Sequence, residues 1–324
     1  MHLKGLVSLP KIYYGTRSLE RFQQGSVLTI GAFDGVHRGH QLIIQRMRLK
    51  ANELGLPSVA VTFYPDPAYF FNPEQAPAQI MSWREKTLAL LGQGIDAVVC
   101  LQFNEVIRGM SAQGFVQEVL LKNLGCKFVI VGDDFRFGSG REGDIHLLSE
   151  MSETYGFEVE QTSTYLHEEE RISSTRVREL LRRSMFDAAE NLLGRPYEVC
   201  GRVVRGHQLG RELGFPTANI PLKRRRMALS GVYAVRMKIG TEWFHGAANV
   251  GCRPAVNSVE RPLLEVHLLD FDEDLYGKPV KVRFEKKIRE EQDFESIEAL
   301  KAAIKSDVDD VKAWFAAQDP ASSD

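Results

Sequence analysis

The chain has 324 residues, of which 44% are hydrophobic and 26% are charged, and its formal net charge is −2. A chain of this length is typical of about two domains, and its composition supports a buried core and argues against extensive disorder. The charge balance does not indicate a nucleic-acid binder or a polybasic membrane clamp. No apolar run approaches the ~18 residues of a membrane span, and the first residues do not resemble a secretion signal. We therefore expect a cytoplasmic protein without nucleic-acid or membrane partners.

Short β-branched runs alternate with amphipathic helical stretches between residues 25 and 193. Near-continuous apolar runs of this kind are typical of strands covered on both faces, as in a parallel sheet. We expect a doubly wound, Rossmann-like α/β domain over residues 1–193, with ligands bound beyond the carboxyl ends of its strands. The expected strands are 26–31, 58–63, 97–101, 128–132 and 157–162.

The pattern changes near Pro196, where strand-like segments begin to follow one another without an intervening long helix. These segments predict an antiparallel barrel or sandwich over residues 194–324. Apolar residues spaced three or four apart, from Phe294 to Phe315, predict a closing helix that packs on it. The expected strands are 197–204, 231–239, 242–250, 263–269 and 280–284.

The four cysteines, Cys100, Cys126, Cys200 and Cys252, are widely spaced and form no CxxC pair. This spacing favours reduced, mostly packing cysteines over a disulfide framework or a zinc site. An oligomer is compatible with the sequence but is not indicated by it.

The loop after the first expected strand, GAFDGVHRGH at 31–40, has the composition of a phosphate-binding loop. Its glycines allow close backbone approach, and amides at the start of the following helix point at a bound anion. His37 and His40 can donate hydrogen bonds to phosphate oxygens during phosphoryl or nucleotidyl transfer. The alternatives are a His-x-x-His metal pair and histidines that only cap the helix.

A second candidate phosphate site is RISSTRVR at 171–178, which opens a later helix. Serine and threonine at a helix start are often only caps. Here Arg171, Arg176 and Arg178 accompany them, a denser set of donors than a cap needs. Together with the loop at 31–40, this motif suggests two clamps on one triphosphate.

The second half of the chain contains a glycine-rich stretch that ends in Pro-Thr-Ala-Asn at 216–219. Turn chemistry is the commoner explanation of such a stretch, but Thr217 and Asn219 supply oxygen atoms at alternate positions that could face one Mg²⁺. Glu265, within LLEVHLL, either faces solvent or is placed for proton transfer. The basic run Lys223–Arg226 is interpreted as a solvated loop, with a nucleic-acid or nuclear-import patch as the weaker alternative.

Four motifs of the first half, GAFDGVHRGHQ, TFYPDP, GDDFRFGSGREGD and RISSTRVR, are together similar to the FMN adenylyltransferase module of bacterial bifunctional riboflavin kinase/FAD synthetases. Two departures from that pattern are Ala32, where asparagine is common, and Asp66, where histidine is common. An acidic group at position 66 alters the charge near an anionic substrate. The resemblance implies ATP contacts by Gly31, Phe33, Asp34, His37, His40, Arg171, Ser174, Thr175 and Arg178, and a flavin pocket near Phe63, Asp66, Asp134, Phe135 and Phe137.

The second half resembles the riboflavin kinase module of the same family, which implies an antiparallel β-barrel with a C-terminal helix. The resemblance implies that Glu265 is the general base for the ribityl 5′-hydroxyl, that Arg289 lies near the flavin, and that Thr217 and Asn219 help hold Mg²⁺. The implied ATP contacts of this module are Gly206, Gly210, Arg211, Gly214, Thr217 and Asn219.

The resemblance extends from about residue 12 to residue 316 and implies a bifunctional enzyme of flavin cofactor synthesis. The expected reactions are riboflavin + ATP → FMN + ADP, and then FMN + ATP → FAD + pyrophosphate. One alternative keeps a single activity, if Ala32 and Asp66 impair FMN binding. Another is a regulator that senses a flavin or a nucleotide without turnover, although Glu265, His37 and His40 speak against it.

Overall fold

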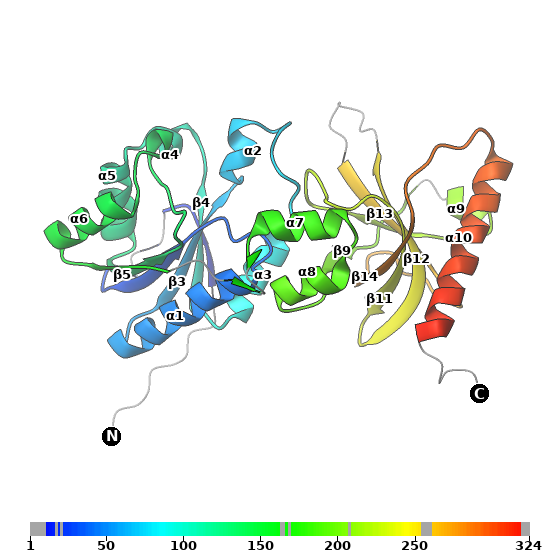
Figure 1. The fold of residues 1–324 in the computed structure, drawn as a ribbon, viewed down its shortest axis with the longest axis horizontal. Coiled ribbons are helices and arrows are strands. Elements are labelled where there is room, and N and C mark those ends of the chain that lie inside the picture. Colours follow the sequence, from blue (N-terminus) through cyan, green and yellow to red (C-terminus); the bar gives the residue numbers. More distant parts are fainter. Residues whose placement is uncertain are drawn as a thin grey trace, which may run out of the picture. The chain divides into compact units, whose positions relative to one another are not determined.

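The computed structural model describes residues 11–16, 19, 22–162, 166–167, 170–206, 209–253 and 261–318 (Figure 1). The chain forms two compact units, the first from residues 1–77 and 86–173 and the second from residues 78–85 and 174–324. These units differ from the expected division at 193/194 in two places, because residues 78–85 and 174–193 pack with the second unit. The extents of the two functional domains, 1–193 and 194–324, stay a prediction.

The first unit is built on a six-stranded, fully parallel sheet in the order β1-β4-β3-β2-β5-β6. The five expected strands are confirmed, and the unpredicted β1 pairs with β4. The strands are β1 (Lys11–Tyr14), β2 (Ser26–Ile30), β3 (Ser58–Tyr64), β4 (Ala97–Gln102), β5 (Cys126–Val131) and β6 (Glu158–Gln161), and a small antiparallel pair follows, β7 (Leu166–His167) and β8 (Glu170–Arg171).

Helices pack around this sheet and supply much of its core (Figure 1). Helix α1 (Arg38–Leu54) buries Ile44, Met47 and Ala51, and it ends where Gly55 adopts a left-handed φ of 65°, as the sequence predicts. The other helices of the unit are α2 (Pro67–Phe71), α4 (Glu105–Gly109), α5 (Ala112–Gly114), the π-helical segment η2 (Phe115–Asn123), the short 3₁₀ turn η3 (Ser139–Arg141) and α6 (Ile145–Tyr155). Helix α3 (Trp83–Gly92) begins among residues of the second unit and continues into the first.

The strand order reverses at β2. Strands β3 and β4 lie to one side of β2, and β5 and β6 lie to the other. In an open parallel sheet, the loops that leave the carboxyl ends of the strands at such a reversal enclose a ligand crevice. The loops in question follow β2 and β5, and they carry two of the predicted motifs.

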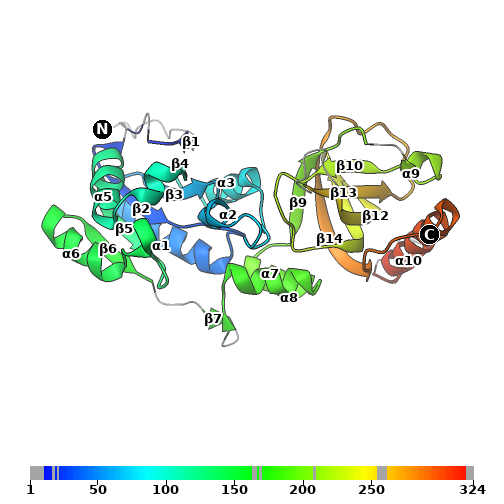
Figure 2. The ribbon, with the colours of Figure 1, turned by 90° about the horizontal axis from the view of Figure 1, so that it is seen from above.

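The second unit contains a six-stranded antiparallel sheet in the order β10-β13-β12-β11-β14-β9 (Figure 2). A bridge between Val204 and Asn219, with the Val204 amide 2.8 Å from the Asn219 carbonyl, brings the two ends of this sheet together and nearly closes a barrel. The expected barrel is thus confirmed, with β10 as an unpredicted strand. The strands are β9 (Glu198–Arg202), β10 (Ala218–Pro221), β11 (Gly231–Ile239), β12 (Glu242–Arg253), β13 (Arg261–Leu268) and β14 (Pro279–Arg289).

Helix α10 (Ile297–Gln318) packs on the barrel through the predicted apolar stripe (Figure 2). Val308, Val311 and Phe315 form a buried cluster with Ala234 of β11 and Ala247 of β12. The Phe315 ring also stacks on His245, with 3.7 Å between the ring centroids. The remaining helices of this unit are α7 (Ser174–Arg182), α8 (Phe186–Leu193) and α9 (Leu209–Glu212).

Residues 78–85 are held in the second unit by a buried ion pair between Glu85 and Arg224. The Arg224 Nη2 atom lies 2.6 Å from Glu85 Oε2, and the two side chains are only 1% and 7% exposed. Arg224 also donates to the Ile80 carbonyl at 2.8 Å, and Glu85 accepts from the Cys200 amide at 2.6 Å. The interpretation of the whole run Lys223–Arg226 as solvated is therefore wrong for Arg224, although its neighbours Lys223, Arg225 and Arg226 are exposed.

Within the described ranges, none of the helices combines the length and the apolar character that crossing a bilayer requires. Cys100, Cys126 and Cys200 are free thiols in this part of the chain, the first two buried and the third exposed.

We expect Arg224→Met to destabilise the second unit by about 3–5 kcal/mol, because it leaves the buried Glu85 carboxylate without its cation. All three tryptophans, Trp83, Trp243 and Trp314, belong to this unit, so urea unfolding followed by tryptophan fluorescence reports on it selectively. Arg225→Met, at an exposed neighbour, is the matched control and should change stability by less than about 0.5 kcal/mol. Equal unfolding midpoints for the two variants would contradict the importance of the pair.

Candidate functional sites

The loop after β2 is held in a constrained conformation around His37. His37 precedes helix α1 as its N-cap, and its Nδ1 accepts from the His40 amide at 3.4 Å. Phe33 and Val36 have φ angles of 51° and 41°, in the left-handed region that side chains rarely adopt. Such backbone strain concentrates at functional sites, because the surrounding structure has to enforce it.

The two histidines of this loop stack on each other, with 3.7 Å between ring centroids and 16° between ring planes. Phe33 packs edge-on against His40 at 5.2 Å. The His40 Nδ1 atom is buried and has no hydrogen-bond partner among the described residues. Burial, the neighbouring His37 and Lys86 together lower the pKa of His40 well below its ordinary value. His40 is therefore neutral at pH 7, and within the described part of the chain its Nδ1 has no hydrogen-bond partner.

The RISSTRVR motif begins beside this loop. A methyl group on Gly39 would lie 3.7 Å from the Ile172 carbonyl, an ordinary van der Waals distance, so the two motifs are neighbours, and it would lie 3.2 Å from His37 Nδ1, a tighter contact within the loop itself. Arg171, directly before Ile172, forms ion pairs with Asp133 at 2.8 Å and with Asp134 at 3.2 Å. The structure thus brings predicted residues of the loops after β2 and β5 together with the start of the RISSTRVR motif.

The other predicted phosphate ligands of this motif, Ser174, Thr175 and Arg178, lie at the start of α7 in the second unit. Arg178 donates from Nε to the Ala78 carbonyl at 2.6 Å. Their assignment to the phosphates of a nucleotide stays a prediction.

Aromatic side chains predicted for a flavin pocket contact one another around Phe115. The Phe135 and Phe137 rings stack at 5.3 Å, and Phe137 and Phe63 lie 6.0 and 6.5 Å from the Phe115 ring. Phe137 is buried, whereas Phe63 and Phe135 are partly exposed. Asp66 caps helix α2 by accepting from the Ala68 amide at 3.0 Å, so this departure from the family pattern has a local structural role.

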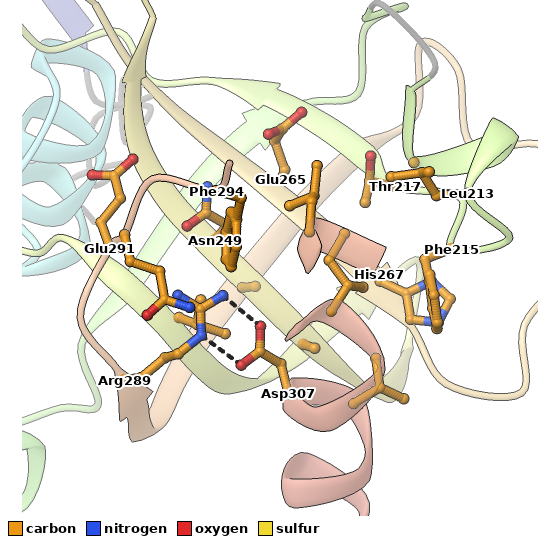
Figure 3. A pocket seen from close by; sticks show the side chains of 18 of the residues that line it. Leu213, Phe215, Thr217, Asn249, Glu265, His267, Arg289, Glu291, Phe294 and Asp307 are labelled. Carbon is orange, nitrogen blue, oxygen red and sulfur yellow. Dashed lines mark hydrogen bonds and ion pairs between the residues drawn. The ribbon is translucent and has the colours of Figure 1, made fainter. Parts of the chain in front are cut away.

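The barrel unit contains two adjoining pockets that share Thr217 and Asn219 in their walls. One pocket, of about 500 Å³, is lined largely by apolar groups such as Phe215 and Phe294, together with Glu265 and Arg289 (Figure 3). The other, of about 480 Å³, is lined by more polar groups. A molecule in each pocket would meet the other at Thr217 and Asn219.

Strand register aligns three polar residues across the barrel beside this meeting point. Glu265 of β13 pairs with Asn219 of β10 on one side and with Asn249 of β12 on the other. Residues directly opposite each other on adjacent strands point to the same face of a sheet. Glu265 is half-buried and lines the apolar pocket, and its choice between solvent exposure and proton transfer stays a prediction. Asn249 was not predicted, although a polar residue within the apolar run Ala247–Val250 was a signal of the same kind.

The guanidinium of Arg289 is fixed by a bidentate ion pair with Asp307 of helix α10. Nε lies 2.7 Å from Oδ1 and Nη2 lies 2.8 Å from Oδ2, and Asp307 is only 6% exposed. Figure 3 shows this pair and Glu265 apart from each other in the pocket wall. Asp307 is a second residue that the sequence analysis missed, because only tertiary structure places it beside Arg289.

The glycines predicted in the more polar pocket differ in their roles. A methyl group on Gly206 would lie 2.3 Å from Asn219 Oδ1, and one on Gly210 would lie 2.5 Å from the Phe215 carbonyl, so both backbones approach other groups closely. Gly206 and Arg211 line this pocket, and Gly210 lines the apolar one. Gly214 lines neither of these two pockets and has a φ of 91°, a conformation that favours glycine.

Comparison with known proteins relates each half of the chain to one enzyme module. A family model for FAD synthetase matches residues 19–176, and one for riboflavin kinase matches residues 193–315. The bifunctional riboflavin kinase/FMN adenylyltransferase of Pseudomonas fluorescens is 48% identical over 302 residues, covering 93% of this chain and 97% of the relative. The chain belongs to the bifunctional riboflavin kinase/FMN adenylyltransferase family.

Two further matches extend over most of this bifunctional transferase. The Escherichia coli K12 protein of the same name is 44% identical over 313 residues, which are 96% of this chain and 100% of that protein. The crystal structure of a Streptococcus pneumoniae protein, named a macrolide-efflux protein, has a TM-score of 0.73 and 28% identity, with coverage of 92% and 97%. This last likeness supports the fold, and the name of that protein is not transferred.

The oxygen donors of the kinase half fit a hard divalent cation. Thr217 Oγ1 lies 3.3 Å from Asn219 Nδ2, and the Asn219 amide is buried against Gly206. Asn219 Nδ2 is the donor in that contact, so the atoms that suit a hard cation such as Mg²⁺ are Thr217 Oγ1 and Asn219 Oδ1, and binding of Mg²⁺ there stays a prediction. No group of three or more histidine, cysteine, aspartate or glutamate side chains that could hold a metal occurs among the described residues, and the pair His37 and His40 belongs to no such group.

We expect His40 to remain neutral in solution well below pH 6.5, the value typical of an unperturbed histidine. A histidine whose folded pKa is depressed takes up a proton on unfolding, so it contributes stability that is lost as the pH falls below about 6.5. An NMR titration of the histidine ring signals tests this, with His40→Gln to assign the signal. A His40 signal that titrates near pH 6.5 would contradict the burial argument.

Proposed function

We propose that the two activities of this bifunctional family are carried by the two sites described above, with riboflavin phosphorylated in the barrel and FMN adenylylated at the β2 and β5 loops. As a member of the family, the chain forms FMN from riboflavin and FAD from FMN. ATP, riboflavin, FMN and FAD are accordingly its substrates and products. The buried thiols Cys100 and Cys126 and the use of ATP support a cytoplasmic location.

The observation that carries the kinase assignment is the wall that the two barrel pockets share. We place the flavin ring in the apolar pocket, near Arg289, and ATP in the more polar pocket, near Gly206 and Arg211. The ribityl chain and the γ-phosphate then meet at Thr217 and Asn219. Mg²⁺ held by these two residues would neutralise phosphate charge during the transfer.

Glu265 is the proposed general base for this step. The ribityl 5′-hydroxyl is neutral, so its proton passes to the Glu265 carboxylate as its oxygen bonds to the γ-phosphorus and ADP leaves. This proposal is supported by two observations: Glu265 lines the apolar pocket, and it pairs across the strands with Asn219, which lines both pockets. The ion pair with Asp307 fixes the guanidinium of Arg289, which we place beside the flavin in the apolar pocket.

The adenylyl transfer needs no such base. The nucleophile is a phosphate oxygen of FMN, already an anion, which attacks the α-phosphorus of ATP and displaces pyrophosphate. The histidines His37 and His40 are proposed to donate hydrogen bonds to the charge that develops on the phosphates. Arg171 is proposed to exchange its partners Asp133 and Asp134 for phosphate oxygens, and the aromatic set at Phe63, Phe135 and Phe137 to border the flavin.

We expect Glu265→Gln to lower the rate of riboflavin phosphorylation by roughly 10²–10⁴, the usual contribution of a general base. Adenylylation of supplied FMN should continue, and the tryptophan fluorescence of the second unit shows whether the barrel is folded. The matched control is Glu291→Gln, which removes another carboxylate from the lining of the same pocket and should change the rate less than about tenfold. A near-normal kinase rate in Glu265→Gln would show that Glu265 is not the base.

We expect His37→Ala or His40→Ala to reduce FAD formation by about 10²–10³, as for loss of one donor to a developing oxyanion. Riboflavin phosphorylation by the same preparation should be unchanged. His146→Ala, at an exposed histidine of α6, is the control for loss of an imidazole from the same unit. An equal fall in FMN and FAD formation by a folded variant would refute the assignment of separate sites.

A further inference from the structure

Lys86 is a buried cation directly behind the histidine loop, and none of the predicted roles uses it. It lies in helix α3, and only 7% of its surface is exposed. Burying an ammonium group costs free energy unless hydrogen bonds and opposite charges compensate it. A cation kept in this position therefore requires a structural or functional reason.

The contacts of Lys86 lead to the histidine loop. Its Nζ donates to the Ala32 carbonyl at 2.8 Å and to Thr62 Oγ1 at 3.3 Å. Thr62 is fully buried in β3, and its hydroxyl donates to the same Ala32 carbonyl at 3.4 Å. Lys86 and Thr62 thus bind one carbonyl from two different elements, and that carbonyl belongs to the residue directly before Phe33, where the strained part of the loop begins.

The charges around Lys86 belong to the same site. Burial lowers the pKa of Lys86, and the carboxylates of Asp66 and Asp34 raise it. Cys100 of β4 also lies near the ammonium. Lys86 in turn contributes to the lowered pKa of His40, together with burial and His37.

We propose that Lys86 is a positioning residue for adenylyl transfer, which holds the Ala32 carbonyl and thereby fixes the loop that presents Asp34, His37 and His40. This inference rests on the proposed function of that loop. It also gives a physical role to two departures from the family pattern. At position 32 only the backbone carbonyl is used, so an alanine suffices, and the negative charge at Asp66 has a buried cation nearby.

Two substitutions separate the hydrogen bond from the charge. Lys86→Met removes both, and it should lower kcat for FMN adenylylation by about 10²-fold, because a displaced loop misplaces the histidine donors. The KM for ATP should change much less than kcat, since donors that act in the transition state are lost. Lys86→Gln keeps a donor without the charge, and its kcat should lie between those of Lys86→Met and the unsubstituted enzyme.

The split between the effects on kcat and on KM is the readout that a purely structural role would not move. The pKa of His40, followed by NMR, reports the loss of the Lys86 charge. It should rise in both variants, since the neighbouring cation is gone. Lys50→Met is the matched control, because Lys50 lies in α1 of the same unit and forms ion pairs with Glu53 and Glu158 instead. This control should leave both kcat and the pKa of His40 unchanged.

Protection of the amides of the parallel sheet against hydrogen exchange shows whether each variant is folded. If Lys86→Met is unfolded, the result for Lys86→Gln decides the test. A folded variant with an unchanged kcat for adenylylation overturns the proposal, and so does a KM for ATP that rises as much as kcat falls. If His37→Ala also leaves adenylylation unchanged, the proposed function of the loop fails instead. If His37→Ala abolishes adenylylation while the Lys86 variants do not affect it, only the role of Lys86 is refuted.

Discussion

The carboxylate of Glu85 accepts hydrogen bonds from donors in three parts of the second unit. It accepts from the Ser82 amide at 2.6 Å at the start of α3, from the Cys200 amide on the barrel, and from the Arg224 guanidinium. Each of these donors is part-buried or buried, so the loss of one acceptor would leave several groups unsatisfied at once. The placement of residues 78–85 on the barrel unit depends on this centre, and the following residue, Lys86, belongs to the other unit.

The kinase site shows how strand register turns scattered residues into a chemical arrangement. Asn219, Asn249 and Glu265 are far apart in the sequence, yet antiparallel pairing places them in one row. The closure of the barrel at Val204 and Asn219 then puts this row beside the boundary of the two pockets. Side chains on neighbouring strands are more rigid than side chains on loops, which suits a step that requires an aligned hydroxyl and phosphate.

The sequence predicts the strands of both units well where apolar runs are long, and less well where they are short or polar. Strand β1 (KIYY) and strand β10 (ANIP) have four residues each, and pairing rather than composition defines them. Arg224 was wrongly predicted to be solvated because a run of four basic residues is usually exposed, and its partner lies 139 residues away. A local signal did exist at Ser82-x-x-Glu85, the spacing of a capping box. Asp307 had none, since only the fold brings α10 to Arg289.

Residues 78–85 belong to the second unit although most of the first unit follows them in the sequence, and this limits how the enzyme could be divided into separate proteins. A gene cut at 193/194 assigns residues 78–85 to the upstream product, although they pack with the downstream one. The downstream product would retain the Arg224 guanidinium without the Glu85 carboxylate. The same cut leaves α7 and α8 with the upstream product as well. A stand-alone kinase that keeps the whole second unit would therefore begin at Ser174 and regain residues 78–85, for example as a peptide grafted ahead of α7 or supplied by the complementary fragment. Although the two activities are assigned to two sites, a single cut after the first unit leaves residues 78–85 apart from the unit with which they pack.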